Sequence, residues 1–264
     1  MFADFSGATR VIYIVGDPIA QVKSPSGVTE MLRARGADAV VVPAHVAPGD
    51  LLAWVSATAA MRNCDGIIAT VPHKFAVLPM CRCLSAQARS IGAVNVMRRD
   101  ANGAWFGDMV DGSGYTTGLA RAGCKPRGQR ALLVGAGGAG SAIAHALVDA
   151  GVAALALHDA DDARRETLAD KLARYGAVRP SRGSADPSGF DLVINATPMG
   201  MKADDPMPID TSRLAATTFV GDVVTMPPIP PLIAAARARG CPTMTGTQMF
   251  EAVRDRIIDF YLSE

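Results

Sequence analysis

The stretch ALLVGAGGAG, residues 131–140, decides the fold of this 264-residue chain. Its apolar half predicts a buried strand, its glycines a tight turn, and the Ala-rich segment 141–150 the helix that follows. Gly135, Gly137 and Gly140 match the pattern of a turn that binds a dinucleotide pyrophosphate, because glycine lets phosphate oxygens approach the amide groups of a helix N-terminus. The alternative is an ordinary strand–turn–helix rich in small residues. The residues expected at the cofactor phosphates are Gly135, Ala136, Gly137, Gly138 and Ala139.

A carboxylate follows at the distance that this pattern requires. The apolar run 152–157 predicts the next parallel strand, and Asp159 comes after it, about 20 residues beyond the glycines. A carboxylate there accepts hydrogen bonds from a ribose 2′-hydroxyl and repels a 2′-phosphate, so we expect NAD rather than NADP. Arg164 and Arg165, further along the chain, are cations that could reach a 2′-phosphate, so NADP stays open as the cofactor. Asp159 is also placed to act as the N-cap of a helix over residues 163–175, and both roles can hold at once.

Composition excludes several classes of function. The net charge of +1 gives no electrostatic case for nucleic acid or an anionic membrane. No apolar run reaches the roughly 18 residues of a membrane span, and residues 1–10 lack the pattern of a secretory signal. The five cysteines form no CxxC pair, which favours reduced thiols in a cytoplasmic protein. The four histidines show no ligand spacing, so we expect no metal.

The chain is predicted to be an open α/β protein of two domains. Strand and helix patterns alternate over residues 1–113, including a hairpin around the turn 100–103, and we expect a substrate-binding and catalytic domain there. Residues 114–241 resume the strand–helix alternation as a Rossmann-type NAD(P)-binding domain. The segment 242–264 ends in a helix with apolar residues on one face, expected to pack back on the first domain.

The candidate catalytic residues lie before the nucleotide domain in the sequence. Oxidation of an alcohol by a nicotinamide needs a group that takes the hydroxyl proton and polar groups that orient the substrate. Lys74 follows a predicted strand at its carboxyl end, where open sheets place ligands. A lysine beside a carboxylate such as Asp111 can pass a proton, and Asn95 is a further polar candidate. Each of these residues, taken alone, is more often a solvated surface residue.

The order of these motifs resembles the shikimate dehydrogenase family, nearly from end to end. The family pattern G-x-P-I begins at Gly16, and the later I-G-A-V-N and N-A-T-P-x-G-M patterns are complete at 91–95 and 195–201. The resemblance implies that Lys74 and Asp111 are the catalytic pair, with Lys74 as the acid and base. The residues that the resemblance places at the substrate are Ser24, Thr70 and Asn95, with Gln248 as a further polar contact. Those that it places along the cofactor are Asn195, Thr197, Met199, Val223, Gly246 and Met249.

The chain departs from the family pattern mainly at substrate positions. Apolar residues or threonine replace polar groups or the motif tyrosine at Val22, Ile68, Met109, Val110, Thr225 and Val253. Each lost hydrogen bond would cost about 1–3 kcal/mol of substrate binding. The segment 159–161 reads DAD where NADP-dependent members resemble N-R-T, which again favours NAD.

The resulting prediction is reversible hydride transfer between a nicotinamide and a cyclic hydroxy acid. Shikimate, quinate and a less polar analogue all remain open as that acid. Alternatives are a folate-interconverting dehydrogenase of similar fold and a non-catalytic NAD-binding sensor. We expect a monomer or homodimer with small-molecule partners only.

Overall fold

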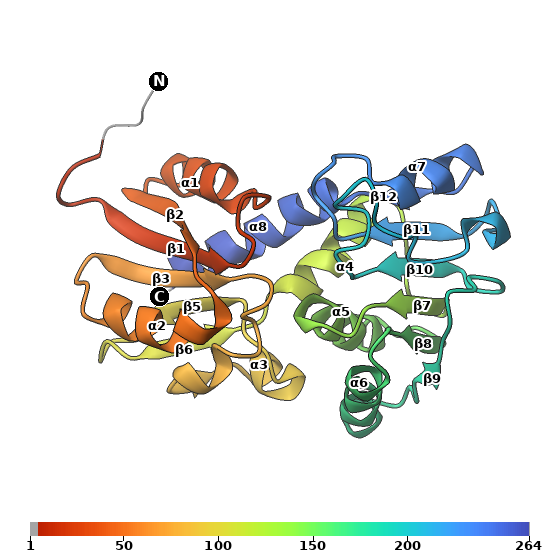
Figure 1. The fold of residues 1–264 in the computed structure, drawn as a ribbon. Helices are drawn as coiled ribbons and strands as arrows, with labels where there is room; N and C mark the ends of the chain where they lie inside the picture. Colours follow the sequence, from red (N-terminus) through yellow and green to blue (C-terminus); the bar gives the residue numbers. More distant parts are fainter. Residues whose placement is uncertain (1–4, 264) are drawn as a thin grey trace. The chain divides into compact units, whose positions relative to one another are not determined.

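The computed structural model describes residues 5–263 and divides into two compact units (Figure 1). Unit 1 comprises the chain up to Val110 together with the segment from Arg254, and unit 2 comprises Asp111–Val253. No helix within the described residues is long and apolar enough to cross a membrane.

Unit 1 is built on a mixed six-stranded sheet of order β2-β1-β3-β5-β6-β4. Its strands are β1 (Arg10–Gly16), β2 (Ala39–His45), β3 (Cys64–Ala69), β4 (Cys83–Leu84), β5 (Val96–Arg99) and β6 (Trp105–Asp108). Its helices are α1 (Ser24–Ala34), α2 (Leu51–Ala59) and α3 (Ala86–Ile91), with short 3₁₀ turns η1 (Pro48–Asp50) and η2 (Leu78–Met80). Strands β1, β2 and β3 are parallel, whereas β5 runs antiparallel to both β3 and β6. The strand and helix alternation expected for this region is therefore confirmed.

The expected hairpin lies between β5 and β6. Asp100 N–H donates to the carbonyl of Ala104, and the Asp100 carboxylate accepts from the amides of Asn102 and Ala104. Gly103 takes a φ of +77°, a conformation that favours glycine. The local sequence DANG therefore makes the turn by itself, which is why the hairpin was predictable.

Unit 2 is a parallel sheet of order β12-β11-β10-β7-β8-β9, with helices on both faces. Its strands are β7 (Arg130–Val134), β8 (Ala154–His158), β9 (Ser181–Arg182), β10 (Leu192–Asn195), β11 (Phe219–Asp222) and β12 (Thr243–Met244). Its helices are α4 (Asp111–Arg121), α5 (Gly138–Asp149), α6 (Asp162–Tyr175) and α7 (Pro231–Ala238), with η3 at Thr211–Arg213. The strand order reverses at β7, so the expected Rossmann-type arrangement is confirmed, and its ligand crevice is predicted between the ends of β7 and β10.

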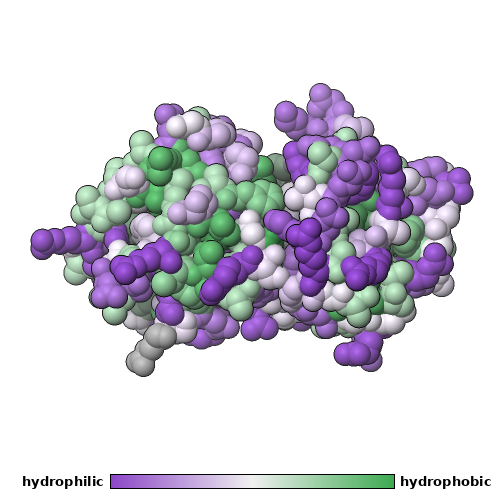
Figure 2. Space-filling model, turned by 90° about the horizontal axis from the view of Figure 1, so that it is seen from below, coloured by the Kyte–Doolittle hydropathy of each residue, from purple (hydrophilic) through white to green (hydrophobic). Residues whose placement is uncertain are grey.

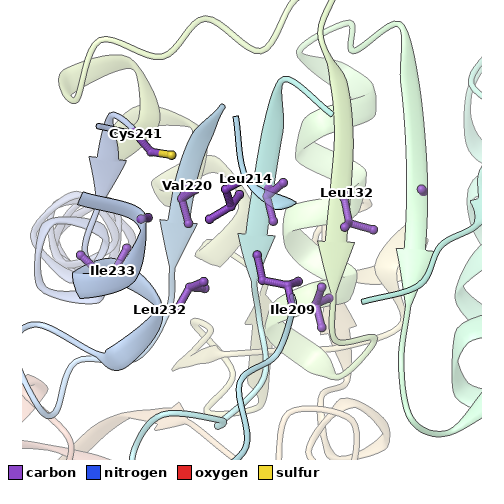
Figure 3. Close-up of a cluster of buried hydrophobic side chains, with 11 residues drawn as sticks. Leu132, Ile209, Leu214, Val220, Leu232, Ile233 and Cys241 are labelled. Atoms are coloured by element: carbon purple, nitrogen blue, oxygen red, sulfur yellow. The ribbon is translucent and has the colours of Figure 1, made fainter. Parts of the chain in front are cut away.

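A close-packed cluster covers one face of this sheet. Leu132 from β7, Val220 from β11 and Leu232 and Ile233 from α7 meet there (Figure 3). All of these side chains are at most 2% exposed. The cluster fixes α7 against the sheet and leaves the carboxyl ends of the strands to the loops.

Helix α8 (Gly246–Leu262) is shared between the units, since unit 2 ends at Val253 and unit 1 resumes at Arg254. Near its end, Tyr261 packs directly against Gly66 of β3, where a Cβ would lie 2.2 Å from the ring. The Tyr261 hydroxyl donates to the carbonyl of Met97 in β5 at 3.3 Å. The end of the C-terminal helix therefore packs on the sheet of unit 1.

Candidate functional site

The carboxyl edge of the unit 1 sheet collects most of the polar residues predicted to bind substrate. Strands β1 and β3 end there, and β5 begins there because it runs antiparallel to β3. The amide of Ala69 donates to the carbonyl of Asn95 at 2.8 Å, so Thr70 and Asn95 lie at the same edge. Gly16, at the end of β1, lets Thr70 approach that strand, since a Cβ there would lie 2.5 Å from the Thr70 methyl group.

Lys74 lies in a compact turn directly after β3. Its carbonyl accepts from the amide of Val94 at 2.9 Å. The neighbouring His73 is 1% exposed, and its Nε2 donates to the carbonyl of Val46 at 2.8 Å. Sequence reasoning missed His73, because nothing local shows that its ring reaches the loop after β2. These two bonds fix the backbone from which the Lys74 side chain extends.

Asn95 connects this turn to the end of unit 1. Its side chain is 2% exposed, and its Oδ1 accepts from the amide of Val110 at 2.9 Å. The dipeptide Val94–Asn95 thus bonds to the Lys74 carbonyl on one side and to Val110 on the other. Asp111 is the next residue and begins α4.

Ser24 is the first residue of α1, and its side chain is buried. It follows the loop from β1, and Val22 lies two residues before it in that loop. The segment after β1 therefore contains both the candidate hydroxyl of Ser24 and the apolar side chain of Val22.

Four of the apolar replacements are buried side chains. Ile68, Met109 and Val110 are 4%, 0% and 7% exposed. Val253 is also buried, against Gly114 of α4, where a Cβ would lie 2.5 Å from the valine methyl group. These residues therefore remove hydrogen-bonding groups from the interior. The exposed apolar residues near Lys74 are Val71 and Phe75, and Figure 2 shows that unit 1 presents apolar surface to solvent.

The Gly-rich turn of unit 2 is shaped by close backbone contacts. Gly135 has a φ of +105°, and a Cβ on Gly140 would lie 1.9 Å from the Gly135 carbonyl oxygen. Gly137 is the N-cap of α5 and offers no side chain to its first amides. A Cβ on Gly137 would meet no atom within 4 Å, so space lies open in front of this helix. The turn therefore fits a phosphate group.

Asp159 lies directly beside that turn. One carboxylate oxygen accepts from the amide of Ala136 at 2.6 Å, and the other accepts from the amide of Asp161 at 2.9 Å. The expected N-cap role of Asp159 is wrong. Helix α6 begins at Asp162, and its N-cap is Asp161, whose carboxylate accepts from the amide of Arg164.

The two arginines that left NADP open differ in their surroundings. The guanidinium of Arg164 lies 4.0 Å from the Asp159 carboxylate and is half exposed. Arg165 is buried and paired with Asp162 and Glu166. Arg164 is therefore the arginine of this pair that stands beside Asp159.

Asn195, at the end of β10, organises the next loop. Its Oδ1 accepts from the amide and hydroxyl of Thr197, and its Nδ2 donates to the carbonyl of Met199 at 3.1 Å. The second Nδ2 hydrogen goes to Asp222 of β11, also at 3.1 Å. The side-chain amide of Asn195 is fully used, so its role in this structure is to shape the loop that carries Thr197 and Met199.

The segment after β12 closes the same edge of the sheet. A Cβ on Gly246 would lie 2.1 Å from the carbonyl oxygen of Val224, so only glycine fits against the loop containing Val223. Gln248 Oε1 accepts from the amide of Thr245 at 2.9 Å, and Thr245 Oγ1 accepts from the amide of Gln248. This is a capping box for α8, and its T-x-x-Q signal was present in the sequence but not used. Met249 follows and is buried.

Helix α4 brings its first turn close to α5. A Cβ on Gly112 would lie 2.3 Å from the carbonyl oxygen of Ala142, in the second turn of α5. Asp111 therefore begins a helix that packs against the one following the Gly-rich turn. No group of three or more potential metal ligands occurs in the part of the chain that the structure describes.

Comparison with known proteins agrees with this arrangement. The family model for the shikimate dehydrogenase substrate binding domain matches residues 14–97. The shikimate dehydrogenase (NADP(+)) of Acidiphilium cryptum (strain JF-5) is 37% identical over 244 residues, which cover 92% of this chain and 87% of that protein.

Solved structures show the same fold over nearly the whole chain. Quinate dehydrogenase from Corynebacterium glutamicum in complex with NAD is 32% identical, with a TM-score of 0.85 and coverage of 97% of this chain and 94% of that one. Ligand-free 5-ketofructose reductase of Gluconobacter sp. strain CHM43 is 29% identical, with a TM-score of 0.83 and the same coverage. The chain therefore belongs to the shikimate dehydrogenase family, whose members are NAD(P)-dependent oxidoreductases that act on a CH–OH group.

Proposed function

We propose that this chain reversibly oxidises a cyclic hydroxy acid of the shikimate or quinate type, or a less polar analogue, with NAD as the preferred cofactor. Lys74 and Asp111 are the proposed catalytic pair. The observation that carries the proposal is the double hydrogen bonding of Val94–Asn95. This dipeptide binds the Lys74 carbonyl and the Val110 amide, one residue before Asp111.

The bound nicotinamide supplies the hydride acceptor. During oxidation the Lys74 amine takes the proton of the substrate hydroxyl, and during reduction the Lys74 ammonium returns it. Asp111 is the proposed partner of Lys74 in this proton transfer. Ser24, Thr70, Asn95 and Gln248 are the proposed hydrogen-bonding partners of the substrate, Gln248 through the amide hydrogens that its cap does not use.

The nicotinamide dinucleotide is proposed to lie along the carboxyl edge of the unit 2 sheet. The turn 135–139 would hold its pyrophosphate, and the loops carrying Asn195, Thr197, Met199 and Val223 would line the rest, with Gly246 and Met249 near the nicotinamide. Asp159 supports NAD, because its carboxylate is held at the end of β8 by two amides. Arg164 opposes that preference, since it is close enough to partner a 2′-phosphate.

A second candidate is reduction of a neutral keto sugar. It is favoured by the likeness to 5-ketofructose reductase and by the apolar residues Val22, Ile68, Met109 and Val110 at positions where the family pattern has polar groups. In the segment after β1, Val22 leaves Ser24 as the remaining candidate hydroxyl for a carboxylate, whereas a neutral polyol needs no carboxylate site.

Initial rates separate these candidates. Oxidation of shikimate and of quinate is measured with NAD and with NADP, and reduction of 5-ketofructose with NADH and with NADPH. We expect turnover of one of the two acids, with higher kcat/KM for NAD. Turnover of the keto sugar alone would replace the first candidate by the second, and a preference for NADP would overturn the cofactor assignment.

A further inference from the structure

Asp222 is the last residue of β11 and is completely buried. Its Oδ1 accepts from the amide of Val224 at 2.9 Å and from Nδ2 of Asn195 at 3.1 Å. One carboxylate oxygen therefore joins the loop after β11 to the loop after β10. Both loops belong to the proposed dinucleotide edge.

The second oxygen of this carboxyl group has no hydrogen-bond partner among the described residues. The hydroxyl of Tyr115, from α4, is also buried without a partner. It lies against the residue preceding Asp222, since a Cβ on Gly221 would lie 2.1 Å from the tyrosine oxygen. Two buried polar groups without partners in one region are unusual, because each forfeits its hydrogen bonds to water.

We propose that Asp222 is a positioning residue for the dinucleotide site: through its bonds to Val224 and Asn195, its carboxyl group holds the loops after β10 and β11 in the shape that the cofactor requires. Oδ2 accepts from no described group, and a buried oxygen that lacks donors favours the protonated, neutral acid. This inference rests on the proposed dinucleotide site.

The electrostatic surroundings favour the neutral acid. Burial raises the pKa of the Asp222 carboxyl to about 7, and hydrogen bonds from Val224, Asn195 and Val223 only partly oppose this. None of these three groups carries a charge. Burial also raises the pKa of Tyr115, and Asp222 and the Cys124 thiol add to that effect, so the phenol keeps its proton.

The raised pKa of Asp222 makes the stability of the folded chain depend on pH. The folded pKa of Asp222 lies above its ordinary value of 3.8, so between these values the folded chain binds a proton that the unfolded chain has lost. The stability that this group contributes is complete below the lower value and is lost as the pH rises to about 7. Above that pH a buried carboxylate weakens the support of both loops.

Three variants test the proposal through NADH binding, measured by fluorescence titration, which needs no identified substrate. Asp222→Asn keeps an acceptor at Oδ1 and carries no charge at any pH, so we expect a Kd within about twofold of the wild type and no pH dependence from this site. Asp222→Leu removes both hydrogen bonds that join the two loops and should raise the Kd for NADH about tenfold or more. Val220→Ala, in the core of the same strand, is the control for general destabilisation and should leave the Kd unchanged.

The proposal is overturned if Asp222→Leu binds NADH like the wild type, if Asp222→Asn binds as weakly as Asp222→Leu, or if Val220→Ala weakens binding equally. If Asp222→Leu does not fold, infrared spectroscopy decides. Near pH 6 the wild type should show a buried carboxylic acid band that Asp222→Asn lacks, and the absence of that band overturns the proposal.

Failure of the dinucleotide site itself has a different signature. In that case Gly137→Ala and Asp159→Asn would also leave the Kd for NADH unchanged. If those two variants weaken binding while Asp222→Leu does not, only the positioning role fails.

Discussion

The carboxyl edges of the two sheets are constructed differently. At the edge of unit 2, Asn195 makes four hydrogen bonds and Asp159 accepts from two amides. Gly140 and Gly246 there lie against backbone too closely for any other residue. The edge of unit 1 is fixed mainly through its backbone and Asn95, and its chemistry depends on side chains such as Lys74. The proposed dinucleotide edge is therefore shaped by glycine contacts and side-chain-to-backbone bonds, whereas the proposed substrate edge depends on the side chains that project from it.

The largest expected effect falls on the edge of unit 1. Lys74→Met removes the amine but keeps the volume of the side chain, and we expect kcat to fall about 10³-fold, because proton transfer by a positioned group contributes about 10²–10⁴. The Kd for NADH should be unchanged. Lys125→Met, at an exposed lysine, is the matched control and should retain full activity. Turnover that survives the loss of Lys74 would show that another group moves the proton.

The next effect tests how strictly backbone shape controls unit 2. Gly140→Ala forces a Cβ against the Gly135 carbonyl and should destabilise the fold by about 1–3 kcal/mol, measured by urea unfolding. Gly137→Ala enters open space, so its unfolding midpoint should match the wild type while NADH binding weakens. Equal stability of the two variants would contradict the close packing described above.

The ratio of kcat/KM for NAD to that for NADP should change by about tenfold in variants of Arg164 and Asp159, the size expected for one charged hydrogen bond. Arg164→Ala should lower kcat/KM for NADP and leave that for NAD unchanged, because its guanidinium stands beside Asp159. Asp159→Asn should lower the preference for NAD. Arg174→Ala, on the exposed face of the same helix, is the control, and a similar change in that variant would point to net charge rather than to a local contact.

The smallest effect separates the two roles of Gln248. Loss of the capping box in Gln248→Ala should cost about 1 kcal/mol of stability, measured by thermal unfolding, whereas Gln248→Glu should retain it. If the side-chain amide also binds substrate, both variants raise the KM for substrate. An unchanged KM in both would leave the residue a helix cap only.

The same contrast explains what the sequence could predict. The turn at residues 131–140 and the hairpin turn at Asp100–Gly103 depend on local backbone requirements, so their sequences were sufficient. The N-cap of α6 was misassigned by two residues, because three acidic residues lie within four positions and only the helix register selects Asp161.

Long-range pairing set the limit of prediction. The bond from His73 to the loop after β2 and the pairing of Asn195 with Asp222 join the ends of strands that are distant in sequence. No pattern within one segment encodes such contacts, since they depend on which strands become neighbours. The same holds for Asn95, whose bond to Val110 appears only once β5 and β6 pair.

The return of α8 to β3 has a consequence for synthesis. Gly66 and Met97 emerge from the ribosome long before Tyr261, because all of unit 2 is synthesised after Met97 and before Tyr261. Strand β3, which leads to Lys74, therefore lacks its contact with Tyr261 until unit 2 has been translated and is able to fold. The order of synthesis therefore allows unit 2 to be completed first. The strand before Lys74, the proposed catalytic residue, gains its last packing contact only afterwards.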